Sequence, residues 1–117
     1  MITALACSLV GQQQPVTVRP GTRAAKLYGA MTAIEDYYCN YGVNPDYHRP
    51  LDEAGLRVSG VGGAGELRIV EIPDHPFFLA TLFLPQARST RTSPHPLLRG
   101  YAAAVAAARH RTRASTA

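Results

Sequence analysis

A nearly continuous apolar run over residues 77–84 most constrains what this chain can fold into. It reads Phe-Phe-Leu-Ala-Thr-Leu-Phe-Leu, has the length of one strand, and follows the turn-forming residues 73–76. A strand without polar alternation is typical of the middle of a sheet that is covered on both faces. We therefore expect residues 77–84 to lie at the centre of a β-sheet with a layer on each side.

Two segments before that run predict a β-hairpin. Residues 56–59 and 67–72 alternate apolar and polar side chains, and four glycines cluster between them. That cluster joins two strands rather than a strand and a helix, so it does not predict a phosphate-binding loop. Residues 16–18 and 34–43 are two further expected strands, the second because its tyrosines favour extended backbone.

The helix signals are short until the end of the chain. Thr22 and Gly29 have the positions of an N-cap and a left-handed C-terminal residue around a helix over 23–28. Because Pro50 interrupts the preceding segment, we expect only a helical turn over 50–54. A last helix is predicted from residue 96 onward, with His95 as its cap. Its narrow apolar stripe consists of Leu98, Tyr101, Val105 and Ala108.

The size and element types predict one α/β domain over residues 1–117, built on a mixed β-sheet with a hairpin and flanking helices. Residues 110–117 are expected to be disordered. Eleven of the 12 basic residues are arginines, and together with the 10 glycines and 9 prolines this bias is typical of a high-GC, actinobacterial genome.

Composition also limits the function classes. The formal net charge is +4, but the basic excess sits mainly at the C-terminal end and is not interleaved with aromatics, so we expect no nucleic-acid partner. The 2 cysteines have no metal-ligand spacing, so neither a metal nor another cofactor is expected. The apolar N-terminal run is shorter than the roughly 20 residues of a membrane span, so we expect a cytoplasmic protein without a membrane partner.

Several segments together resemble a known family. They are Pro20-Gly21-Thr22, Leu27-Tyr28-Gly29, Leu51 to Gly60, Glu71 to Phe78, His95-Pro96-Leu97 and Gly100-Tyr101. From about Val10 to Ala108 the sequence resembles the C-terminal half of the class I glutamine amidotransferase domain of CTP synthase. The resemblance implies a truncated amidotransferase-like fold.

The resemblance also implies that the family's glutaminase chemistry is lost. The family's nucleophile elbow, Gly-x-Cys-x-Gly, does not occur in this sequence. The family's His-Pro-Glu dyad falls on Leu84-Pro85-Gln86, and its carboxylate-binding arginine falls on Asn40. Leucine cannot move a proton, and glutamine carries no charge to orient a histidine. We therefore expect no hydrolysis of glutamine.

The altered strand is the candidate site. With strand alternation, Asp36, Tyr38 and Asn40 share one face, and Gln86 is expected to face them. Asp36 and Tyr38 are the candidate catalytic residues, while Asn40, Tyr41 and Gln86 are the expected substrate-binding residues. His48 is a further candidate acid or base because histidine titrates near neutrality. The structural alternative is that the strand acquired aromatic residues only because they pack well.

Two functions remain open. The first is a small cofactor-independent enzyme of bacterial specialised metabolism, a lyase, isomerase or cyclase that acts on a small molecule. The alternative is a catalytically inactive pseudo-amidotransferase that serves as a ligand-binding or regulatory module. In either case we expect a homodimer, because a strand apolar on both faces needs more cover than one narrow helix provides.

Overall fold

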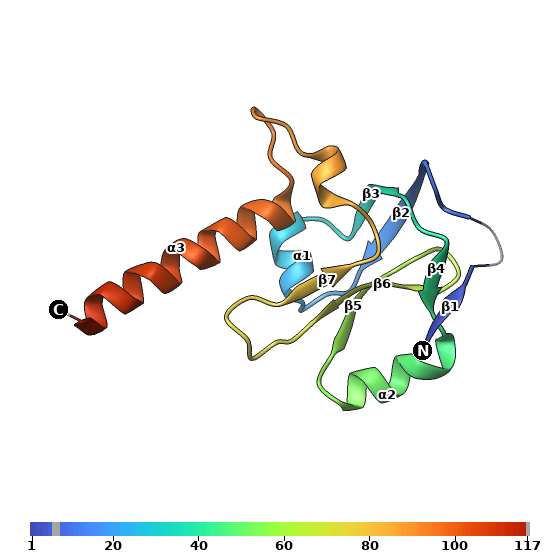
Figure 1. The fold of residues 1–117 in the computed structure, drawn as a ribbon, viewed down its shortest axis with the longest axis horizontal. Coiled ribbons are helices and arrows are strands. Elements are labelled where there is room, and N and C mark those ends of the chain that lie inside the picture. The colour runs from blue at the N-terminus through green and yellow to red at the C-terminus, as the bar shows by residue number, and fades with distance from the viewer. Residues whose placement is uncertain (6–7, 117) are drawn as a thin grey trace.

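An antiparallel sheet forms the body of the molecule (Figure 1). The computed structural model describes residues 1–5 and 8–116, with side chains as far as residue 111. The strand order is β3-β2-β5-β6-β7. The strands are β2 (Gln12–Val18), β3 (Thr32–Tyr37), β5 (Arg57–Val61), β6 (Leu67–Glu71) and β7 (Leu79–Thr81). The hairpin predicted around the glycine cluster is confirmed as β5 and β6.

The apolar run over residues 77–84 does not form the centre of the sheet, so that prediction is wrong. Only β7 is extended and paired, and it is an edge strand that contacts β6 alone. Phe78 is 39% exposed, and among the run's large side chains only Phe83 is fully buried. The middle strand is β5, whose Val58 and Ser59 are buried.

The chain after β7 explains this difference because it leaves the edge and crosses to the other end of the sheet. The Leu82 N–H donates to the Arg68 carbonyl at 3.0 Å, and the Leu84 N–H donates to the Asp36 carbonyl at 2.9 Å. Cys39 Sγ lies 2.9 Å from the Leu82 carbonyl. The run therefore closes a curled sheet between β6 and β3, with Phe83 inside.

The core lies between this curled sheet and two helices, α1 (Arg23–Tyr28) and α3 (Pro96–Thr116). The predicted caps of α1 are confirmed: Thr22 accepts a hydrogen bond from the Ala25 N–H, and Gly29 has φ +66°. The core residues, all 4% exposed or less, are Val16, Val18, Ala24, Tyr37, Ile69, Phe83 and Leu97.

The predicted strands over 16–18 and 34–43 both differ from the structure. The first extends back to Gln12 because it pairs with β3 along its length. The second is interrupted after Tyr37 and resumes as β4 (Tyr41–Val43), which pairs with β1 (Ile2–Ala4) in a separate small sheet. One sequence segment thus serves two sheets.

The helical segment before β5 is longer than the predicted turn. Asn44 accepts a hydrogen bond from the Asp46 N–H and begins a short 3-10 helix, η1 (Pro45–Tyr47), which continues into α2 (His48–Glu53). Pro50 does not interrupt it because it lies in the first turn of α2, where backbone N–H groups have no partner within the helix.

The last helix projects from the globule (Figure 1), although its stripe was expected to cover the sheet. Leu97 is buried, but Leu98, Tyr101 and Val105 are 40%, 56% and 49% exposed. The radius of gyration is 15.4 Å, against about 13 Å for a compact domain of this length. The helix continues through Thr116, where disorder was expected over 110–117; residue 117 lies outside the described residues.

Within the described part of the chain, no helix is both long enough and apolar enough to cross a bilayer.

Candidate functional site

Asp36, the first candidate catalytic residue, lies near the end of β3 and is partly buried, with its side chain 28% exposed. Arg88 approaches it, with 3.5 Å between the guanidinium Nη1 and the carboxylate Oδ1. The Asp36 carbonyl is occupied by the Leu84 N–H. The carboxylate of Asp36 therefore has a cation as its neighbour and forms an ion pair with it.

The neighbouring candidates turn toward solvent. Tyr38 is 68% exposed and lies just after the end of β3, while Tyr41 is 60% exposed at the start of β4. Asn40 is exposed, and its Oδ1 accepts a hydrogen bond from Ser8 Oγ at 2.5 Å. The expected face of Asp36, Tyr38 and Asn40 is thus not an enclosed site, because the strand ends at Tyr37.

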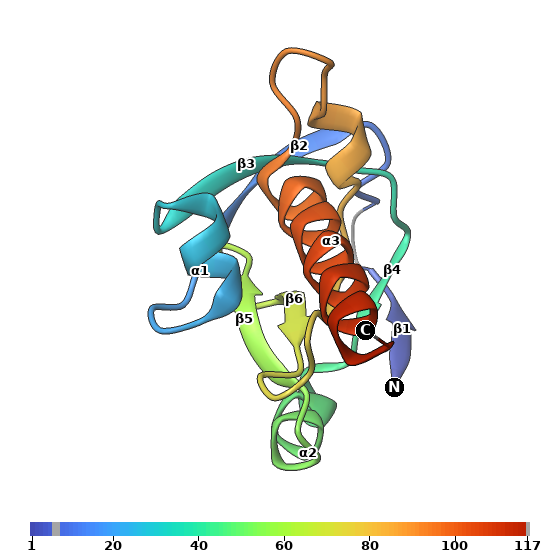
Figure 2. The same cartoon turned by 90° about the vertical axis from the view of Figure 1, so that its left-hand side faces the viewer.

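His48 lies apart from the other candidates. It begins α2, which lies at the opposite end of the molecule from β3 in both views (Figures 1 and 2). Its Nε2 is buried and has no hydrogen-bond partner among the described residues. The structure therefore does not bring His48 to Asp36, and any acid or base role would be at a separate place.

The positions of the family's dyad do lie close to β3. Leu84 is half-buried and bonded through its N–H to Asp36, and Pro85 begins a short 3-10 helix, η2 (Pro85–Arg88). Gln86 lies in that helix and is exposed. The two residues on which the resemblance places the dyad are thus an aliphatic side chain and a neutral amide. Neither can activate a nucleophile.

A buried polar cluster that the sequence interpretation missed connects three elements. Glu35 in β3 is 1% exposed, and its Oε2 lies 2.7 Å from His95 Nε2; His95 is 4% exposed. The Tyr28 hydroxyl donates to the same carboxylate oxygen. Burial, followed by the hydrogen bond to Glu35, raises the pKa of Tyr28 well above its usual range. The only sequence signal for this cluster is the alternation that placed Glu35 with Tyr37.

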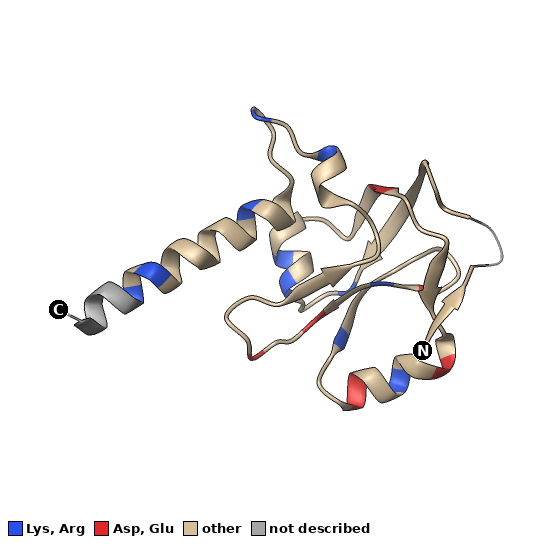
Figure 3. Cartoon of the chain, viewed as in Figure 1, with Lys and Arg blue, Asp and Glu red and all other residues tan. Residues whose placement is uncertain are grey.

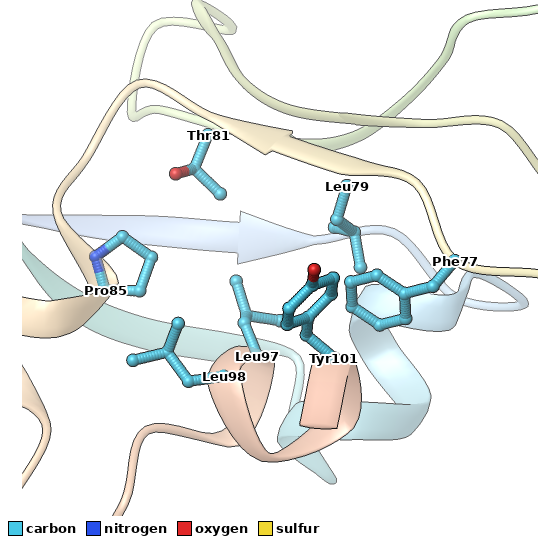
Figure 4. A pocket seen from close by; sticks show the side chains of 7 residues that line it. All are labelled: Phe77, Leu79, Thr81, Pro85, Leu97, Leu98 and Tyr101. Atoms are coloured by element: carbon cyan, nitrogen blue, oxygen red, sulfur yellow. The ribbon is translucent and has the colours of Figure 1, made fainter. Parts of the chain in front are cut away.

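An apolar pocket of about 160 Å³ opens between β7 and the start of α3 (Figure 4). Arg23 lies over the Phe77 ring at 5.4 Å, and the Phe77 and Tyr101 rings are 5.7 Å apart. The pocket is lined by Phe77, Leu79, Thr81, Pro85, Leu97, Leu98 and Tyr101. With one hydroxyl from threonine and one from tyrosine, it suits an apolar group rather than acid or base chemistry.

Among the described residues, no three His, Cys, Asp or Glu side chains are grouped as metal ligands would be. Cys39 is a free thiol that contacts the Leu82 carbonyl. Cys7 lies outside the described residues.

Comparison with known proteins gives one consistent result. No protein-family model matches the chain. CTP synthase of Thermococcus gammatolerans is 43% identical over 99 residues, 83% of this chain and 18% of that protein. CTP synthase of Methanosphaerula palustris is 46% identical over 90 residues, 77% of this chain and 17% of that protein. The chain therefore spans less than a fifth of the length of these relatives.

A solved structure agrees in fold. The glutaminase domain of Trypanosoma brucei CTP synthase, solved with bound acivicin, superposes with a TM-score of 0.77 at 31% identity. The match covers 86% of this chain and 40% of that chain. The expected amidotransferase-like α/β fold is thus confirmed. This chain is therefore a homologue of CTP synthase that corresponds to part of the family's glutamine amidotransferase domain.

Proposed function

We propose that this chain is an amidotransferase-like binding module that does not hydrolyse glutamine. The observation that carries the proposal is the identity of Leu84 and Gln86, the two residues on which the family's dyad falls by the sequence resemblance. Removing members of a catalytic unit costs nearly all of its activity, because they act together. The position of the family's carboxylate clamp holds Asn40, whose side-chain oxygen is bonded to Ser8.

The alternative, a lyase, isomerase or cyclase acting on a small molecule, has less support. It requires Asp36 and Tyr38 to act on one substrate in a place that excludes water. Tyr38 is 68% exposed, and the Asp36 carboxylate lies 3.5 Å from Arg88. These observations favour a surface ion pair beside an exposed phenol, so the binding module is the better reading of the geometry.

An assay of ammonia release from glutamine tests the proposal. We expect no release above the rate without protein. The variant Leu84→His/Gln86→Glu, which rebuilds the dyad, should remain inactive because no elbow cysteine is present in the sequence. Ammonia release by the unmodified chain that disappears in Cys39→Ala would overturn the proposal and identify Cys39 as a nucleophile.

The binding surface that we propose is the apolar face formed by β7 and α3. Its pocket and the exposed stripe of Leu98, Tyr101 and Val105 are continuous, because Leu98 and Tyr101 belong to both. Contiguous exposed apolar surface is typical of protein interaction sites. A second copy of this chain suits the face, since each projecting α3 can cross the other at Tyr101. Basic residues lie toward the C-terminal part of α3 (Figure 3), away from such a crossing.

A further inference from the structure

One buried arginine of the sheet has too few hydrogen-bond and charge partners. Arg68 lies in β6, and its side chain is 8% exposed. Among the described residues its only ion pair is with Glu66, at 3.6 Å between Nη2 and Oε2. Its Nε has no hydrogen-bond partner among the same residues. A buried guanidinium is costly unless its charge and its N–H groups are satisfied.

A second orphaned group lies beside it. The Arg68 guanidinium carbon is 5.2 Å from the centre of the Tyr37 ring, and Tyr37 is 1% exposed. The Tyr37 hydroxyl has no hydrogen-bond partner in the described part of the chain. Burial raises the pKa of Tyr37 to about 12, so the hydroxyl is a neutral donor near neutral pH. Two adjacent buried donors thus lack an acceptor.

Two cavities of about 360 and 340 Å³ meet at this point, and Leu5, Glu66 and Arg68 line both. The remaining lining of the second cavity is largely apolar and includes Val43 and Leu67. The first cavity is also lined by the amide side chains of Gln12 and Gln14. The junction of the two cavities therefore offers one cation, Arg68, with a largely apolar cavity on one side and a partly polar cavity on the other.

We propose that the junction of these cavities binds the carboxylate of a small organic acid, with Arg68 as the anchor and Glu66 as a displaceable internal substitute for it. A carboxylate matches the fork of a guanidinium and accepts two N–H bonds, Nε–H included. The hydrocarbon part of the acid contacts Leu5 and the apolar lining of the second cavity.

Glu66 fits the role of substitute because its contact with Arg68 is long and its side chain is 40% exposed. Its other oxygen accepts from the Ala64 N–H at 3.1 Å, so the carboxylate has an alternative partner in the glycine-rich turn. A single cation that is already partly neutralised favours a monovalent carboxylate over a phosphate, which needs more positive charge. This site is independent of the proposed apolar interaction face.

The test uses sodium hexanoate as the probe and the full chain, observed by NMR through the Arg68 Nε–H and backbone amide signals. We expect saturable shifts of the Arg68 signal with hexanoate and none with hexanamide, the neutral isostere. Glu66→Gln removes the competing carboxylate and should tighten binding by about 10-fold, the equivalent of one charge-assisted hydrogen bond. Arg68→Met should abolish binding, whereas Arg57→Met, at an exposed position in β5, should not change it.

A second variant keeps the proposal testable if Arg68→Met fails to fold. Arg68→Lys keeps one positive charge at the same position and removes only the planar fork of N–H groups, so it should fold and bind hexanoate several-fold more weakly. Equal, non-saturable shifts with hexanoate, hexanamide and inorganic phosphate would overturn the site. If hexanoate binds Glu66→Gln no more tightly than the unmodified chain, the proposal that the acid displaces the Glu66 carboxylate from Arg68 is wrong.

Discussion

His95 Nε2 lies 2.7 Å from Glu35 Oε2, although 60 residues separate them along the chain. His95 Nδ1 accepts a hydrogen bond from the Leu97 N–H, so the neutral ring carries its proton on Nε2 and donates it to Glu35. One imidazole therefore caps α3 and hydrogen-bonds to one oxygen of a carboxylate that is 1% exposed in β3, whose other oxygen, Oε1, has no partner among the described residues. The Tyr28 hydroxyl, at the end of α1, donates a hydrogen bond to the same Glu35 oxygen.

Replacing His95 should therefore destabilise the fold. In His95→Ala, the Glu35 carboxylate loses its imidazole donor and α3 loses its cap, and losing a buried hydrogen bond to a charged group costs about 1.5–3 kcal/mol. Urea unfolding at neutral pH measures the change in the free energy of unfolding. His110→Ala, at an exposed position in α3, is the control and should change stability by no more than about 0.5 kcal/mol. Equal stability of both variants would contradict a structural role for the cluster.

High pH should weaken the fold through its buried tyrosines. The pKa of Tyr37 is raised to about 12, chiefly by burial, and a tyrosine in the unfolded chain titrates near about 10. Between these values the unfolded chain binds fewer protons than the folded chain, so the free energy of unfolding falls as pH rises. The contribution of Tyr37 to the free energy of unfolding is fully present below about pH 10 and is lost as the pH rises toward the folded-state pKa. Unfolding midpoints from pH 9 to 11.5 should fall less steeply in Tyr37→Phe than in the unmodified chain; identical slopes would contradict this.

The close approach of β5 and β6 should make one glycine irreplaceable. A Cβ added at Gly60 would lie 2.6 Å from Ile69 Cγ1, and Ile69 is fully buried in the core. Gly60→Ala should therefore cost about 1–3 kcal/mol, as overpacked cores do. Gly63→Ala is the matched control in the same hairpin, because nothing lies within 4 Å of its added Cβ. Thermal unfolding of the two variants makes the comparison, and a Gly60→Ala midpoint equal to that of Gly63→Ala would be evidence against the close contact.

Self-association should depend on the stripe of α3. We expect light scattering at micromolar concentration to give a mass near twice the 12.6 kDa of the chain. Tyr101→Glu places a charge in the proposed contact and should give the monomer mass. Tyr47→Glu is the control, since Tyr47 is also exposed but lies in η1. A monomer for the unmodified chain, or equal masses for the two variants, would exclude this interface.

Local chemistry was sufficient to predict several elements. Thr22 and Gly29 bound α1 as expected, since a side-chain acceptor and a residue free to adopt positive φ are local requirements of helix ends. The hairpin of β5 and β6 followed from alternation and the glycines between the strands. The loss of the dyad at Leu84 and Gln86 stays a prediction of the resemblance, and it needs only residue identity and no tertiary structure.

Long-range pairing decided the rest. The run over 77–84 is as apolar as a central strand, but the bonds of Leu82 to Arg68 and of Leu84 to Asp36 take it from one edge of the sheet to the other. No local pattern encodes which backbone groups a strand will find as partners. Asp36 and Tyr38 do not share a strand face, because β3 ends at Tyr37 and the chain then pairs with a different strand, β1, from Tyr41 onward. Glu35 and His95 met only because the folded chain brought a strand and a helix end together, where the buried carboxylate and the imidazole hydrogen-bond to each other.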